Sequence, residues 1–189
     1  ETKCKARAAA GSDARMSGCP LPVVICSGSG NQGLTVSVPI ITTAEELGKS
    51  DDELYRALIF ANLLTLYVKS GIGKLSAYCG VVSAGVVSVA GIAFLKGDSK
   101  DIIENTLVKG LASLSGIVCD GAKPSCAGKI AISLDGAFMG YKQARLNKNY
   151  QKGDGLVAYT VDDTIRSIGT VARGMKETDV VILNEMLKH

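Results

Sequence analysis

Histidine, which serves as the base or the metal ligand in many enzyme sites, occurs once among the 189 residues, as the last residue, His189. A terminal side chain is usually frayed, so a Ser/His/Asp or Cys/His nucleophilic site would lack a positioned imidazole. Histidine-rich metal sites are excluded for the same reason. The net charge is only +3 and the basic residues are scattered, so the sequence gives no indication of nucleic-acid binding.

Aromatic side chains are also scarce. They make up 5% of the chain and tryptophan is absent, whereas glycine occurs 22 times. A core of Ala, Gly, Val, Ile and Leu lets backbones approach closely, which suits tightly packed helices. Apolar residues reach 47% and charged residues 21%, the balance of a globular chain. We therefore expect a mainly α fold over a single domain, residues 1–189.

The cysteines do not form a C-x-x-C pair, which disfavours a zinc ribbon and a thioredoxin-like site. No signal peptide opens the chain and its length needs no disulfides, so we expect reduced thiols and a cytoplasmic location. The chain begins with Glu1 in an alanine-rich stretch, without an initiator Met, so we expect it to be the back part of a longer protein. The six cysteines are Cys4, Cys19, Cys26, Cys79, Cys119 and Cys126.

A glycine-rich stretch follows the short apolar run at 23–25 and matches the letters G-x-G-x-x-G. A dinucleotide fold would need a second strand ending in an acid, but the following segment carries Pro39 and continues into a helix. Successive small residues at a helix start instead expose N–H groups that can hold a carboxylate. We predict substrate binding by the residues of this stretch: Ser27, Gly28, Ser29, Gly30, Asn31, Gln32 and Gly33.

Capping signals and apolar spacing predict six or seven helices and little or no sheet. Lys3–Ala10 resembles a helix that stops at Gly11, which would put Asp13 and Arg15 on a turn. The other expected helices are one from the capping box Ser50–Glu53 to Lys69, one within Leu75–Leu95, one over Lys100–Gly116, one over Pro124–Arg145, one from Thr160 to Gly174, and a last one capped by Thr178.

The segment Leu75–Leu95 contains no charged residue and by length alone could span a membrane. Its many Ala, Gly and Ser residues dilute its hydropathy, and its neighbours are amphipathic. We therefore interpret it as a buried central helix, rich in glycine and alanine, and expect no membrane association. Cys79 lies near its N-terminal end, where the helix dipole lowers a thiol pKa.

Cys119 and Cys126 lie seven residues apart around a turn that contains Asp120-Gly121 and Pro124. Such a turn between two helices can aim two thiolates at one point, and Cys79 is the best candidate for a third sulfur. Thiolates without histidine in a low-charge helical core suit an iron–sulfur cluster better than zinc. The alternative is that these cysteines are small buried packing residues.

The motifs AAAGSDARM, SGSGNQG, KLSAYCG, SAG…AGIAFL and IVCDGAKPSCAGKIA occur in this order along the chain. Together they resemble the L-cysteine desulfidase family, part of the wider iron–sulfur L-serine dehydratase α-chain group. The resemblance covers essentially the whole chain. It corresponds to the carboxy-terminal half of the usual family protein.

The resemblance implies an enzyme with a 4Fe–4S cluster and no pyridoxal phosphate, which releases sulfide, ammonia and pyruvate from L-cysteine. Cys79 and Cys119 match ligand positions. The third ligand is either Cys126, at a shorter spacing than in serine dehydratases, or a residue of the missing half. Candidate bases in this chain are Asp13, Lys74, Asp120 and Lys129, of which Asp13 and Lys74 are our predictions, and a histidine of the missing half is an equal alternative.

Two other functions stay open at this stage. One is dehydration of L-serine or a related hydroxy amino acid by the same chemistry, and the other is a catalytically silent helical domain for assembly or regulation. The expected partners are a small amino acid, the missing amino-terminal half and, as an open alternative, a second copy in a homodimer.

Overall fold

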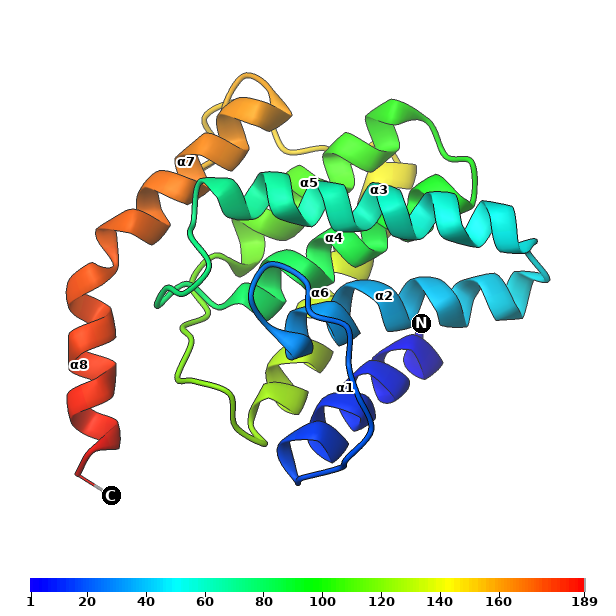
Figure 1. Cartoon of the computed structure of the whole chain (residues 1–189). Coiled ribbons are helices and arrows are strands. Elements are labelled where there is room, and N and C mark those ends of the chain that lie inside the picture. Colours follow the sequence, from blue (N-terminus) through cyan, green and yellow to red (C-terminus); the bar gives the residue numbers. More distant parts are fainter. Residues whose placement is uncertain (189) are drawn as a thin grey trace.

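Eight helices account for the regular secondary structure of residues 1–188, the part of the chain that the computed structural model describes (Figure 1). The mainly α class is confirmed, with one helix more than the upper expected number. The helices are α1 Thr2–Met16, α2 Gly30–Leu47, α3 Asp51–Ser70, α4 Gly80–Leu95, α5 Lys100–Leu114, α6 Cys126–Arg145, α7 Val161–Gly174 and α8 Lys176–Met186.

The uncharged helix α4 lies at the centre and packs against α2, α3, α5 and α6 (Figure 1). All its residues except Gly80 and Phe94 are buried. Small residues let the neighbours approach closely, because a Cβ added at Gly85 would lie 2.5 Å from Ser133 Oγ, and one at Gly91 would lie 2.6 Å from Ile40 Cδ1. The prediction of a buried central helix is confirmed, although it begins at Gly80 and the preceding 71–79 segment is a loop.

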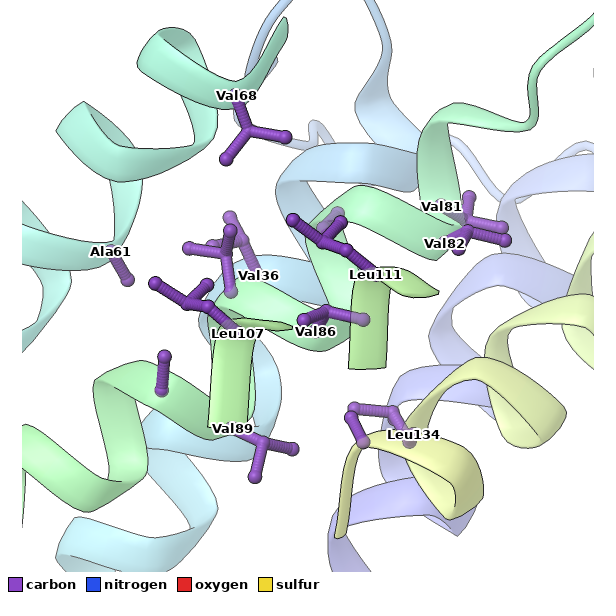
Figure 2. Packing of buried hydrophobic residues seen from close by; sticks show 14 of the residues in the cluster. Val36, Ala61, Val68, Val81, Val82, Val86, Val89, Leu107, Leu111 and Leu134 are labelled. Carbon is purple, nitrogen blue, oxygen red and sulfur yellow. The ribbon is translucent and has the colours of Figure 1, made fainter. Parts of the chain in front are cut away.

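The core around α4 consists of branched aliphatic side chains from several helices (Figure 2). Burying one such side chain stabilises a fold by about 1.5–3 kcal/mol, so the apolar stripes of the outer helices hold α4 in place. The core members that Figure 2 labels include Val36 of α2, Val68 of α3, Val86 of α4, Leu111 of α5 and Leu134 of α6.

Several helix starts are the ones that the sequence predicts. The Ser50 side chain accepts from the Glu53 N–H while the Glu53 carboxylate accepts from the Ser50 N–H, which completes the capping box of α3. Thr160 caps α7 in the same way through the N–H of Asp163. Side-chain caps of this kind stabilise a helix by about 1 kcal/mol.

Two expected boundaries are wrong. Helix α1 continues through Gly11 to Met16, so Asp13 is helical rather than on a turn. The packing of α1 against α2 and α6 explains this, because it outweighs the roughly 0.5–1 kcal/mol that an interior glycine costs. Thr178 lies inside α8, which follows α7 almost directly and needs no cap of its own there.

Helix α8 extends away from the other helices (Figure 1). None of its residues is buried, and Val180, Val181 and Leu183 are exposed. No helix within residues 1–188 combines the length and the apolarity that crossing a membrane requires.

We predict that Gly85→Ala lowers the free energy of unfolding by about 1–3 kcal/mol, because the new methyl group overlaps Ser133 in the α4–α6 contact. The matched control is Gly128→Ala in α6, where no atom lies within 4 Å of the new methyl group. The control should gain about 0.5–1 kcal/mol from helix propensity. Urea denaturation followed by circular dichroism measures both, and equal stability of the two variants would contradict the packing of α4.

Candidate functional site

Two backbone hydrogen bonds join the end of the 71–79 loop to the segment that follows α5. The Cys79 N–H donates to the Ile117 carbonyl at 3.1 Å, and the Cys119 N–H donates to the Ala77 carbonyl at 2.7 Å. Side chains alternate between the two sides of such an antiparallel bridge, so Cys79 and Cys119 are diagonal neighbours on one side. Residues 40 apart in sequence thus present their thiols together at the N-terminus of α4.

The two thiols share a hydrogen bond that makes them unequal. The bond from Cys79 lowers the pKa of Cys119 to about 6, and the Gly121 N–H and the Lys129 charge act in the same direction. The same bond, together with burial, raises the pKa of Cys79. The interaction thus favours the thiolate form of Cys119 and the thiol form of Cys79.

Two lysines supply positive charge near this thiolate. The Lys129 ammonium is 2.5 Å from the Asp120 carboxylate and donates to the Val118 carbonyl at 3.0 Å. Lys69, on the inner face of α3, is only 4% exposed. Burial lowers the pKa of Lys69, while the Cys119 and Cys79 thiols raise it, which places the ammonium within electrostatic range of both.

The glycine-rich stretch forms a tight turn directly before α2. Cys26 and Ser29 exchange backbone hydrogen bonds of 3.3 and 3.2 Å, and the two residues between them have positive φ. The Ser29 side chain then caps α2 by accepting from the Gln32 N–H. Gly33 is needed for packing, because a Cβ there would lie 1.8 Å from the Val24 carbonyl oxygen. The stretch therefore places the N-terminus of α2 against a loop, without the strand that a dinucleotide fold requires.

The N-termini of α2 and α4 meet through Gln32. A Cβ added at Gly80 would lie 2.5 Å from Gln32 Nε2, so this side chain packs directly beside the residue that follows Cys79. Gln32 Oε1 and Asn31 Nδ2 are buried without a hydrogen-bond partner among the described residues, while Asn31 Oδ1 accepts from Arg15 at 3.0 Å. Buried polar atoms are rarely left unpaired. The unpaired Asn31 Nδ2 and Gln32 Oε1 could therefore donate and accept hydrogen bonds to a small polar ligand.

The two candidate bases are placed differently. Lys74 is exposed and lies beside the glycine-rich turn, since a Cβ added at Gly28 would be 3.4 Å from the Lys74 Cβ. Asp13 is exposed on α1, and within residues 1–188 no hydrogen bond or ion pair joins its side chain to this site. The α1 residue that reaches the site is Arg15, two residues further and therefore on another side of the helix.

Cys126, the first residue of α6, is buried and its S–H donates to the Gly121 carbonyl at 3.5 Å. Among residues 1–188, no three His, Cys, Asp or Glu side chains gather into a group that could hold a metal ion. The structure thus brings Cys79 and Cys119 together and leaves Cys126 outside a three-ligand group.

Sequence reasoning missed Lys69. The sequence marks it only as the end of a helix, although it continues a buried four-residue spacing along α3 that includes Ala57, Ala61 and Thr65. That spacing was a usable signal, because it puts a lysine on the apolar face of the helix.

Comparison with known proteins identifies the relatives of this chain. The model of the serine dehydratase alpha chain family matches residues 1–184. The chain belongs to the serine dehydratase alpha-chain family. A UPF0597 protein of Desulfitobacterium hafniense is 56% identical over 98% of this chain and 43% of its own length, and one of Finegoldia magna is 53% identical over 99% and 45%. The chain therefore spans less than half the length of these relatives.

A third member of the group, a UPF0597 protein of Treponema denticola, is 48% identical over 100% of this chain and 44% of its own length. The names of these relatives state no reaction. The family is thus established from the sequence, and the reaction has to be argued from the residues of the site.

We predict that Cys119 is alkylated by iodoacetamide with a rate that rises with pH and reaches half its maximum near pH 6, because only the thiolate reacts. Cys79→Ala removes the hydrogen bond that stabilises this thiolate. The Cys119 pKa should then move toward the ordinary value of about 8.5, and its alkylation at pH 7 should slow by roughly tenfold.

The measurement is mass-spectrometric mapping of alkylated peptides under anaerobic conditions in metal-free buffer. Cys4→Ala, at the contact between α1 and α2, is the control and should leave the Cys119 profile unchanged. An unshifted profile in Cys79→Ala would show that the two thiols do not interact.

Proposed function

We propose that this chain is the cluster-binding part of an iron–sulfur lyase that eliminates sulfide from L-cysteine. The observation that carries the proposal is the pairing of Cys79 and Cys119 at the N-terminus of α4, in a chain of the serine dehydratase alpha-chain family. A thiolate is the form that binds iron, and Cys119 is held in that form by its neighbour.

The donor set fits a 4Fe–4S cluster in part. Cys79 and Cys119 supply two thiolates, and Lys69 and Lys129 supply positive charge beside them. The third ligand in this proposal is Cys126, after a local shift of the 120–125 turn, or a residue of the part of the relatives' length that this chain does not span. When bound, such a cluster supplies a Lewis-acidic iron for the leaving sulfur or oxygen.

The chain's own residues would hold the amino acid. The helix N-termini of α2 and α4 both point partial positive charge at the place where Gln32 meets Gly80. Asn31 Nδ2 and the N–H groups of the 27–33 turn are the donors for the substrate carboxylate in this proposal. The unpaired Gln32 Oε1 would accept from the substrate ammonium.

Removal of the α-proton and loss of hydrogen sulfide convert L-cysteine to 2-aminoacrylate, and water then hydrolyses this product to pyruvate and ammonia. Of the two predicted bases, Lys74 is beside the turn and Asp13 is exposed on α1. We therefore keep Lys74 as the base that this chain offers, with a base from the rest of the protein as the alternative.

The relatives are longer than this chain, and the segment that they have in addition is our candidate for covering this site. Leu21, Val24, Ile25 and Leu75 are between 66% and 91% exposed and lie on the loops that carry the glycine-rich turn and lead to Cys79. Large apolar side chains gathered at a site favour contact with another protein segment. We propose that the amino-terminal half covers this edge, and that the chain alone is inactive.

A specific observation favours a second candidate function. The family model is named for serine dehydratases, so L-serine or a related hydroxy amino acid is the alternative substrate. Water replaces hydrogen sulfide as the leaving group and every other residue keeps its role. A catalytically silent domain would not need Cys79 and Cys119 to lie together at the start of α4.

The deciding experiment is anaerobic cluster reconstitution of the complete protein that carries this chain, followed by assays of sulfide and pyruvate from L-cysteine and of pyruvate from L-serine. Sulfide together with pyruvate supports the desulfidase. Pyruvate from L-serine alone moves the function to a dehydratase. A protein that binds no iron and forms no product would refute both.

We predict that Cys79→Ala and Cys119→Ala each abolish product formation and lower iron content by at least half, because each removes one ligand. Cys126→Ala does the same only if Cys126 is the third ligand. Cys4→Ala, whose thiol donates to the Pro39 carbonyl between α1 and α2, is the matched control and should retain iron and activity. Iron and acid-labile sulfide assays measure the loading independently of turnover.

We predict that Gly80→Ala raises KM for the amino acid by about tenfold, because its methyl group displaces the Gln32 amide from the binding place. Gly116→Ala, with no atom within 4 Å of its new methyl group, is the control. Steady-state kinetics on both variants test this, and an unchanged KM in Gly80→Ala would remove Gln32 from the site.

A further inference from the structure

Helix α3 packs one face against α4 and α2 and exposes the opposite face, which is also apolar (Figure 1). Among the exposed residues between positions 54 and 67, Arg56 is the only polar one. A helix that is apolar on all sides is normally buried on all sides, so we expect this face to be covered. We call its exposed apolar residues the α3 stripe; they are between 46% and 62% exposed and comprise Tyr55, Ile59, Leu63, Leu66 and Tyr67.

The α3 stripe has the same pattern when the helix is read in either direction. Four of its members recur every four residues. About Ala61, Tyr55 mirrors Tyr67, and the aliphatic Ile59 mirrors Leu63. Side chains with this spacing form one ridge on the helix surface. If two such helices pack antiparallel with these ridges side by side, Tyr55 lies opposite Tyr67 of the second copy, and Ile59 lies opposite Leu63 of the second copy.

An interface between two identical copies requires such a pattern, because a two-fold axis places the same patch against itself. A different protein segment would impose no symmetry on the α3 stripe. The aromatic ends also suit an interface, since tyrosine is enriched at contacts between proteins. Tyr67 is already oriented, because its hydroxyl donates to the Asp162 carboxylate at 2.7 Å. The pattern therefore favours a second copy as the occupant of the stripe.

The charges at the two ends of the ridge complement each other in the same arrangement. Asp51, the first residue of α3, and Gly71, the residue after its end, continue the four-residue series in the two directions. The Arg173 guanidinium donates to the Gly71 carbonyl at 2.7 Å, so a positive charge lies at that end. Asp51 and Arg173 are both exposed, and neither takes part in an ion pair within residues 1–188. Antiparallel pairing would bring Asp51 of each copy beside Arg173 of the other, which favours this orientation.

We infer that the α3 stripe is the interface of a homodimer, in which α3 packs antiparallel against α3 of a second copy across a two-fold axis near Ala61. Ridges of four-residue spacing on both helices give a crossing angle of about −50°. The stripe shares no residue with the edge that we assign to the amino-terminal half, which is formed by Leu21, Val24, Ile25 and Leu75. The inference therefore does not depend on the reaction that the thiol site performs.

The first test measures the mass of the complete protein that carries this chain by sedimentation equilibrium, and we expect a dimer. The variant Ile59→Glu should raise the dissociation constant of the dimer at least about 100-fold, because the interface would bury a carboxylate from each copy among apolar side chains. Its helix content by circular dichroism should be unchanged, since the side chain is exposed in the single chain. The matched control is Ile132→Glu in α6, a similarly exposed isoleucine at 57%, which should stay a dimer.

The second test determines the orientation of the two helices. Copies that carry Tyr55→Cys and copies that carry Tyr67→Cys are co-expressed and treated with a short bismaleimide, and the linked peptides are identified by mass spectrometry. We expect links between position 55 of one copy and position 67 of the other. Links between position 55 of both copies should be absent, because antiparallel pairing about Ala61 separates them by about 18 Å along the helix axis.

The inference is overturned if the wild type is a monomer or if Ile59→Glu stays a dimer. A dimer that gives no link between positions 55 and 67 uses another surface and has the same consequence. A monomeric wild type whose melting temperature falls in Ile59→Glu, but not in Ile132→Glu, would assign the α3 stripe to another segment of the same protein, and this outcome also overturns the inference.

Discussion

The site depends on one short antiparallel contact, in which Tyr78 pairs with Val118 and the flanking residues exchange two backbone hydrogen bonds. These bonds tie the loop before α4 to the loop after α5. Neither loop has enough regular structure to position a side chain by itself. The contact fixes both backbones, so Cys79 and Cys119 lie on the same side of the bridge, and everything that we propose about iron binding follows from that placement.

The contact in turn depends on how α4 is held. Its glycines and alanines allow α2 and α6 to approach until their side chains touch its backbone, and the surrounding aliphatic core leaves it no freedom to rotate (Figure 2). The start of α4 is thereby fixed against the start of α2, which brings Gln32 against Gly80. Two helix N-termini and two thiols from distant parts of the sequence converge because the centre of the fold is built from small residues.

Local signals predicted much of this arrangement. The capping box at Ser50, the cap at Thr160 and the uncharged run that becomes α4 act over a few residues and can be read from the sequence directly. The helical state of Gly11 could not, because the packing of α1 against α2 and α6 overrides the helix-breaking tendency of glycine. The grouping of the cysteines depends on long-range pairing. The sequence predicts that Cys119 and Cys126 converge, with Cys79 as a third sulfur, whereas backbone hydrogen bonds across 40 residues bring Cys79 to Cys119 and leave Cys126 apart.

Helix α4 is buried and helix α8 is not, so α8 should unfold locally more often than α4. Amides of α4 are shielded on every side, so their hydrogens exchange with solvent only when the whole core opens, whereas α8 has no buried residue and its amides exchange through local fraying. The bridge that carries the thiols adjoins the N-terminus of α4, the helix whose amide hydrogens exchange most slowly. The Cys79 and Cys119 amides, which donate the bonds of this bridge, should therefore exchange more slowly than the amides of α8.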